Sequence, residues 1–90
     1  MNISELPLLG SASESMLANA GITTAEQLRE IGAIETFHLV KKSGCKPSLN
    51  LLYALHGALN NLSWREASAP KIRSQLLMEL ESFDEIFSDR

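Results

Sequence analysis

The sequence has few of the side chains that hold metals or form disulfides: one cysteine, Cys45, and two histidines, His38 and His56. A single thiol forms no disulfide within its own chain. These three residues also show none of the paired spacings that are typical of zinc sites. We therefore expect no metal and no cofactor. Cys45 follows a glycine in a predicted loop and has no identifiable base, so it does not indicate a nucleophile.

Long apolar runs and a signal-like N-terminus are also absent. No run approaches the roughly 18 apolar residues that cross a bilayer, and residues 1–10 contain Glu5 but no basic residue, unlike a signal peptide. With a single thiol, these features favour the reducing cytoplasm and no membrane contact. The carboxylates and glycines form no recognisable acid–base pair or phosphate-binding loop. We expect no catalytic residue and no small-molecule substrate.

The charge is unevenly distributed along the chain, although its sum is only −3. Residues 1–40 carry a net charge of −4, residues 41–73 carry +5, and residues 74–90 carry −4. The basic middle either converges into a local patch or consists of scattered, solvated side chains, and both interpretations stay open. The 90 residues, of which 44% are hydrophobic and 21% charged, predict a single globular domain over residues 1–90.

The most informative segment is residues 16–33, whose pattern is helix, tight turn, helix. Gly21 suits the left-handed conformation that ends many helices. Thr23 and Glu26 stand three residues apart, as the N-cap and N3 residues of a capping box do. The second helix is expected from Thr24 to Ile31. The apolar side chains of the two helices are Met16, Leu17, Ala20, Leu28 and Ile31. The pattern predicts a helix-hairpin-helix unit.

Further helices follow from apolar periodicity on either side of this unit. An extended lead-in over residues 1–10 precedes a helix that begins at Ser11 or Ser13 and ends near Ala20. Later helices are expected over residues 33–43 and from Pro70 onward, with a short capped turn at residues 63–66. Lys46-Pro47-Ser48 is expected to open the helix between them, with Pro47 in its first turn, and this central core helix continues through the apolar run from Leu49 to Asn60 and Asn61. Gly57 is expected to let another helix approach closely. No segment alternates with the period of a strand, so we predict an all-α fold of about five helices.

Three isolated side chains also carry expectations. We expect His38 at the surface and His56 on a helix face beside the core. Trp64 is expected to be a core anchor, because a lone tryptophan after a leucine-rich helix is usually buried.

The chain resembles the C-terminal domain of TfoX/Sxy-type proteins from about Leu6 to about Leu80. The resemblance rests on residues 17–33, Val40-Lys41, the Leu49–Leu59 segment and Trp64. It implies an all-helical domain of helix-hairpin-helix or SAM-like type, without enzyme activity, in a bacterial regulator of natural competence and DNA transformation. Founding members of that family carry an additional N-terminal domain, so their whole regulatory role does not transfer to this segment.

Two functions remain as hypotheses. The first is a regulatory or protein-interaction module whose contact residues are Phe83, Ile86 and Phe87, because apolar residues beyond a core often mark a contact surface. The partner is a helix of another protein, a second copy of the chain or a companion N-terminal domain.

The second hypothesis is weak DNA binding directed at the phosphate backbone. Here the turn residues Gly21, Ile22, Thr23 and Thr24 offer amides and hydroxyls to a phosphate, and Lys41, Lys42 and Lys46 neutralise its neighbours. The acidic total charge and the flanking Glu26 and Glu30 count against this hypothesis.

Overall fold

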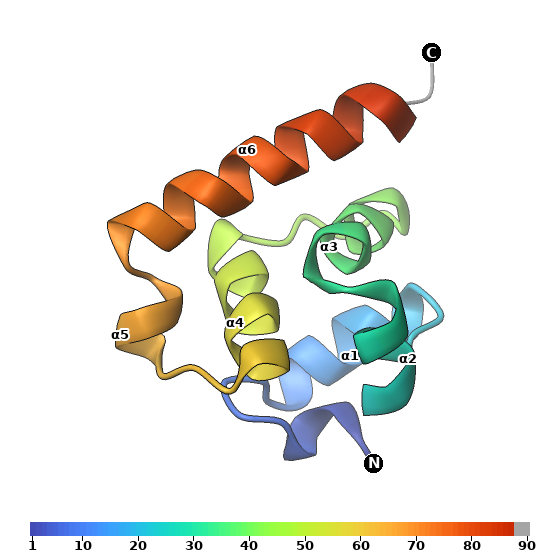
Figure 1. Cartoon of the computed structure of the whole chain (residues 1–90). Helices are drawn as coiled ribbons and strands as arrows, with labels where there is room; N and C mark the ends of the chain where they lie inside the picture. Colours follow the sequence, from blue (N-terminus) through green and yellow to red (C-terminus); the bar gives the residue numbers. More distant parts are fainter. Residues whose placement is uncertain (88–90) are drawn as a thin grey trace.

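A computed structural model describes the backbone of residues 1–87 and the side chains of residues 1–85. The order of elements is a short 3-10 helix η1 (Ile3–Glu5), α1 (Ser11–Asn19), α2 (Ala25–Ile31), α3 (Ala33–Lys42), α4 (Leu49–Asn60), α5 (Trp64–Ala67) and α6 (Pro70–Phe87), as Figure 1 shows. Over this range no strand forms, and Asn2 and Thr24 make an isolated bridge. The all-α prediction is confirmed, with α5 occupying the segment expected as a short turn.

Helix α4 is the central helix, as its apolar sequence predicts. It begins later than expected, because Ser48 has the extended backbone of an N-cap residue, so Pro47 lies before the helix and not in its first turn. It contacts α3, α5 and α6, and Leu52 and Leu55 on it are fully buried. Gly57 faces a crowded neighbourhood, because a Cβ atom there would lie 2.5 Å from Leu8 Cδ1 and 2.9 Å from Ala67 Cβ. Glycine therefore allows the N-terminal segment and α5 to pack closely against α4, which confirms the expected close approach.

The N-terminal segment is more structured than the expected extended lead-in. Its apolar side chains Ile3, Leu6 and Leu9 are each no more than 5% exposed, and they belong to the same core as α4. The Met1 carbonyl accepts a hydrogen bond of 2.9 Å from the Ala25 amide. Burial of these three large apolar side chains offsets part of the entropic cost of ordering the segment, and the local pattern around Pro7 does not reveal this burial.

The capping box of α2 lies one residue later than the sequence pattern suggested. Thr24, not Thr23, is the extended N-cap residue, and its hydroxyl accepts a hydrogen bond from the Gln27 amide. Gln27, not Glu26, supplies the reciprocal N3 side chain. Both registers place a threonine three residues before a suitable side chain, so the sequence allowed either. The predicted box of Ser63 and Glu66 is confirmed at α5.

Two further expectations are wrong. Trp64 is 45% exposed, because as the first residue of α5 it lies at the edge of the bundle, where it lines a small hollow of about 180 Å³ with Leu8 and Met16. His38 is only 9% exposed, because the face of α3 that carries it is covered by α6. His56 is half-buried on α4, as expected.

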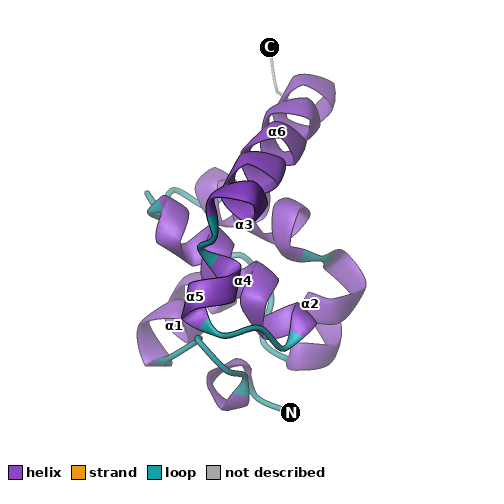
Figure 2. Ribbon diagram, turned by 60° about the vertical axis from the view of Figure 1, so that its left-hand side comes forward, coloured by secondary structure: helices purple, strands orange, loops and turns teal. Residues whose placement is uncertain are grey.

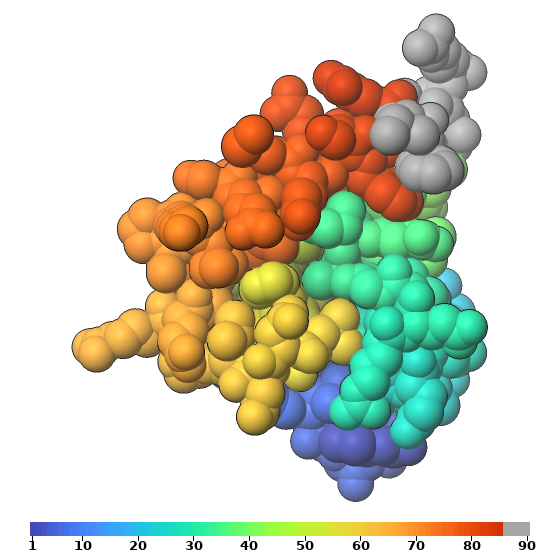
Figure 3. Space-filling view, in the orientation of Figure 1, coloured from blue at the N-terminus to red at the C-terminus, as the bar shows by residue number. Residues whose placement is uncertain are grey.

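Helix α6 lies across α3 and α4 and extends beyond them at its C-terminal end (Figures 1 and 2). Leu76 and Leu80 are 2% and 7% exposed, and Ile72 and Phe83 are half-buried on the same side. The opposite side of α6 forms a ridge along one edge of the molecule (Figure 3). Across residues 1–87, no helix combines the length and apolarity needed to cross a membrane.

Candidate functional site

The turn between α1 and α2 was the first candidate site, and its backbone amides are used within the chain. Gly21 adopts the expected positive φ of +88°. Gly21 and Ile22 donate to the carbonyls of Ala18 and Leu17, at 3.0 and 2.9 Å. The two threonine amides that follow both donate to Gln27 Oε1, at 2.8 and 3.2 Å. Four consecutive amides thus have acceptors before any phosphate arrives.

The N-terminal segment contacts the start of α2, directly after this turn. The Met1 ammonium lies 3.1 Å from the Glu26 carboxylate, and the Met1 carbonyl accepts from the Ala25 amide. Hydrogen bonds from the Glu26 backbone amide and from the Met1 ammonium lower the pKa of the Glu26 carboxyl. Glu26 is therefore ionised at neutral pH and would repel a phosphate at the start of α2. Phosphate contact by Gly21, Ile22, Thr23 and Thr24 stays a prediction that this geometry does not favour.

The three candidate lysines differ in their surroundings. Lys41 Nζ donates to Asp84 Oδ2 at 3.0 Å and lies 5.8 Å from the centre of the Phe37 ring. Its charge is therefore partly neutralised by a carboxylate on α6. Lys42 and Lys46 are exposed, at the end of α3 and in the loop before α4 respectively. The structure thus attaches Lys41 to α6, whereas the hairpin turn contacts the N-terminal segment.

His38, Lys41, Phe83 and Asp84 form a cluster that joins α3 to the last turns of α6. His38 Nδ1 lies 2.7 Å from Asp84 Oδ1, and the Phe83 ring meets the His38 ring edge-on, with 5.0 Å between the ring centres. Burial of Asp84 opposes its ionisation, but the hydrogen bonds from His38 and Lys41 outweigh this effect and lower its pKa. An ionised Asp84 therefore holds both partners at neutral pH.

A histidine hydrogen-bonded to a carboxylate also occurs in catalytic sites, but the His38–Asp84 pair is packed between two helices. The His38 side chain is only 11% exposed and is covered by Phe83, so a substrate has little access to its ring. Among the described residues, no group of three histidine, cysteine or acidic side chains is placed to hold a metal ion. The contacts of the cluster fix the C-terminal half of α6 on α3.

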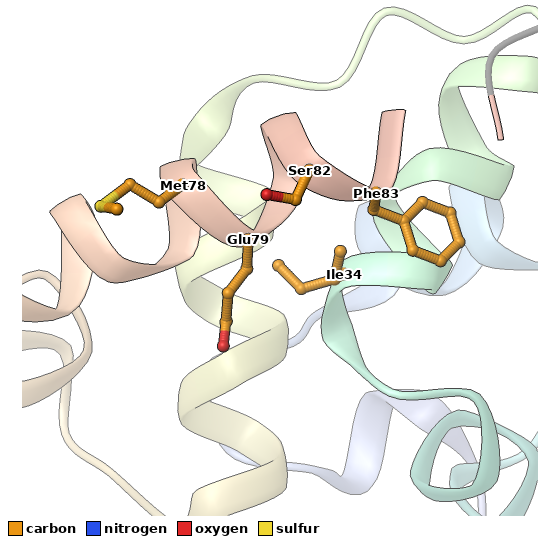
Figure 4. Close-up of a pocket in the computed structure, with 5 residues that line it drawn as sticks. All are labelled: Ile34, Met78, Glu79, Ser82 and Phe83. Atoms are coloured by element: carbon orange, nitrogen blue, oxygen red, sulfur yellow. The ribbon is translucent and has the colours of Figure 1, made fainter. Parts of the chain in front are cut away.

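The second candidate surface lies on α6. A hollow of about 510 Å³ opens between α6 and the start of α3, and Figure 4 shows the five residues that line it: Ile34, Met78, Glu79, Ser82 and Phe83. Ile34 points up toward α6, and the Met78 side chain lies along α6 and extends away from Ile34 and Phe83. The lining is mostly apolar and open to solvent. Such a surface is typical of a contact site for another protein.

The predicted contact residues have different positions relative to this hollow. Phe83 lines it while its ring also packs on His38. The side chains of Ile86 and Phe87 lie outside the described residues, so their part in a contact stays a prediction.

Met78 is the residue that the sequence reasoning missed. Its side chain is 69% exposed, the largest exposed fraction among the exposed large apolar side chains of the described residues. A signal was available, because Met78 falls outside the apolar series Ile72, Leu76, Leu80 and Phe83 that marks the buried side of α6. Among the described side chains of α6, Leu77 is also exposed, at 39%.

Comparison with known proteins identifies relatives of the chain. The family model described as "TfoX C-terminal domain" matches residues 1–80. A crystal structure of an uncharacterized protein from Listeria monocytogenes, in a triclinic form, is 31% identical and superposes with a TM-score of 0.78. The match covers 93% of this chain and 94% of the Listeria chain. No curated protein matches the chain. On the strength of the match over residues 1–80, the chain belongs to the TfoX C-terminal domain family.

Proposed function

We propose that this domain is a non-enzymatic regulatory module of the cytoplasm that acts by binding a protein partner, in the setting of TfoX-type control of competence and DNA transformation. Its contact surface consists of the exposed side of α6 and the adjoining hollow. The observation that carries the proposal is the exposure of Met78 next to a hollow lined by Ile34 and Phe83. A partner that covers this exposed apolar surface and the adjoining apolar hollow removes both from water, which is favourable.

The rigidity of this surface supports the proposal. Helix α6 is anchored at Leu76 and Leu80 by burial, and at Asp84 by its hydrogen bonds to His38 and Lys41. A contact surface on an anchored helix loses little conformational entropy when the partner binds. Substitution of one exposed apolar residue on this helix should then lower the affinity for the partner without changing the position of the helix.

Quantitative affinity capture tests the proposal. The wild-type chain, Met78→Asp and the control Ser15→Asp are used as baits in extracts of the native host, with isotope-coded comparison of the captured proteins. Ser15 is exposed on α1, so its substitution adds the same charge at a distance from the hollow. We expect at least one protein that Ser15→Asp retains and Met78→Asp loses by about tenfold or more, since a central anchor contributes 2 kcal/mol or more in many interfaces. Equal capture by both variants would refute the proposal.

The alternative function is weak, backbone-directed DNA binding by the hairpin. The exposed Lys42 and Lys46 favour it, whereas the occupied amides of residues 21–24 do not. Fluorescence anisotropy of labelled duplex and single-stranded DNA, at low and moderate salt, separates the two functions. Affinity that falls steeply with salt and is abolished by Lys41→Glu with Lys42→Glu would establish the alternative. We expect no binding at either salt concentration.

A further inference from the structure

The outer face of α6 carries an ordered series of side chains. Lys71, Met78 and Glu85 are spaced by seven residues, which is close to two helical turns, so they lie on one stripe along the helix. All three side chains are exposed. The stripe is on the side of α6 opposite Leu76 and Leu80, so the bundle leaves it uncovered.

The charges on this stripe are complementary to those of a second copy of the stripe that runs in the opposite direction. Met78 lies near the middle of α6, eight residues from Pro70 and nine from Phe87. Lys71 and Glu85 stand at equal distances of about 10 Å on either side of Met78, at a rise of 1.5 Å per residue, and have opposite charges. A twofold axis through Met78 therefore places each lysine opposite a glutamate of the other copy.

The neighbouring positions fit the same symmetry. Ser74 and Ser82 flank Met78 at four residues on either side, and both are small and exposed, which permits close approach of two helices. Under the same axis Glu81 lies level with Gln75 of the partner subunit. The two exposed Glu79 carboxylates, each one residue from the axis, lie at nearly the same level and weaken the contact. Neither Lys71 nor Glu85 takes part in the ion pairs formed among the described residues.

We propose that the protein bound at this surface is a second copy of the chain, with the two α6 helices antiparallel and crossing at Met78. The inference rests on the proposed function and names its partner. Met78 of each copy packs against Met78 of the partner subunit at the rim of the hollow that contains Ile34 and Phe83. Lys71 pairs with Glu85 of the partner subunit, and this ion pair occurs twice by symmetry.

The contact surface is small, so we expect the association to be weak. A contact between one face of each 18-residue helix buries less surface in total than the roughly 1,200 Å² that stable complexes bury. The net charge of −3 on each copy also opposes association. We therefore expect a reversible dimer with a dissociation constant of about 10 µM to 1 mM, strengthened at low salt by the two ion pairs.

Sedimentation equilibrium over a concentration series tests this inference with a charge swap. Lys71→Glu and Glu85→Lys each place like charges opposite one another twice, so we expect each to raise the dissociation constant about tenfold or more. The double variant Lys71→Glu with Glu85→Lys restores both pairs, so its dissociation constant should return to within about threefold of the wild-type value. Met78→Glu should abolish the dimer.

Two control variants carry the same changes in net charge elsewhere on the surface. Glu30→Lys on α2 and Lys46→Glu in the loop before α4 are both at exposed positions, and we expect both to dimerise like the wild type. Circular dichroism establishes that each variant is folded. A wild-type chain that stays monomeric up to about 1 mM would overturn the inference. So would a swapped variant that does not recover, or a Met78→Glu variant that dimerises normally.

The two proposals fail separately. A monomeric wild type that still captures a different protein through Met78 overturns the second copy as partner and supports the proposed function. A monomer whose capture is unaffected by Met78→Asp overturns both.

Discussion

Replacing Gly57 by alanine tests the packing at the centre of the fold. Alanine in a helix interior is favoured over glycine by about 1 kcal/mol, so a Gly57→Ala variant would be stabilised if its surroundings were open. They are not open, because the added Cβ would lie 2.5 Å from Leu8 Cδ1 and 2.9 Å from Ala67 Cβ. Optimal carbon–carbon separations are about 3.5–4.0 Å. The flexible end of Leu8 can rotate away, but Ala67 Cβ moves only if α5 moves.

Forcing one methyl group into a packed core costs about 1–3 kcal/mol. Both new contacts would be shorter than 3.0 Å, so the cost belongs in the upper half of this range, about 2–3 kcal/mol. After the gain of about 1 kcal/mol in helix propensity is subtracted, we expect Gly57→Ala to lower the free energy of unfolding by about 1–2 kcal/mol. A domain of this size has a total stability of about 5–10 kcal/mol, so the loss is readily measurable. Urea denaturation followed by far-UV circular dichroism gives both the free energy and its dependence on urea.

A double-mutant cycle with Ala67→Gly identifies the cause of the loss. Ala67→Gly removes the methyl group that the new alanine meets, so the double variant should be more stable than the sum of the single effects by about 1 kcal/mol. A Gly57→Ala variant as stable as the wild type would refute the reasoning, and so would strictly additive effects in the cycle.

Three further predictions use the same measurement. Thr24→Ala should lower the free energy of unfolding by about 1 kcal/mol because it removes the N-cap of α2, whereas Thr23→Ala should cost less than half as much; equal losses would contradict the register of the capping box. Trp64→Ala should cost less than about 1 kcal/mol because the side chain is 45% exposed, and a loss of 3 kcal/mol or more would show that it is a core anchor. Asp84→Asn should cost about 1 kcal/mol at pH 7. The lowered pKa of Asp84 means that its ionisation stabilises the fold above the ordinary pKa of about 3.9 and that this stability is lost as the pH falls through the lower value in the folded state. The difference between Asp84→Asn and the wild type should therefore shrink in acid, and a difference that does not change between pH 7 and pH 2 would contradict this origin.

Local patterns predicted most of the secondary structure. The helices on either side of Gly21, the central helix that ends at Asn60 and the capping box of Ser63 and Glu66 depend on neighbours in sequence, and all are present. The sequence did not decide which threonine caps α2, because Thr23 and Thr24 are adjacent and each has a suitable residue three positions later. Competition between such neighbours is decided by the backbone angles of the turn, which the sequence does not specify.

The candidate site was predicted less well because its contacts join distant segments. His38 and Asp84 are 46 residues apart, so no local pattern indicated that α6 buries His38 or that Asp84 binds Lys41. The Ala25 amide, which follows the hairpin turn, donates to the Met1 carbonyl, and no local pattern indicated this contact between residues far apart in sequence. Phe83 was expected beyond the core as a contact residue, whereas its half-buried ring packs on His38 and also lines the hollow beside α6.

In-cell photo-cross-linking tests most directly whether α6, not the hairpin, is the contact surface. A photoreactive phenylalanine analogue is placed either at Met78 or at Thr23, both exposed, and the chain is expressed in its native host. We predict specific protein adducts from position 78, including a product of twice the chain mass, and no specific adduct from position 23. Adducts formed at position 23 but not at position 78 would contradict the account.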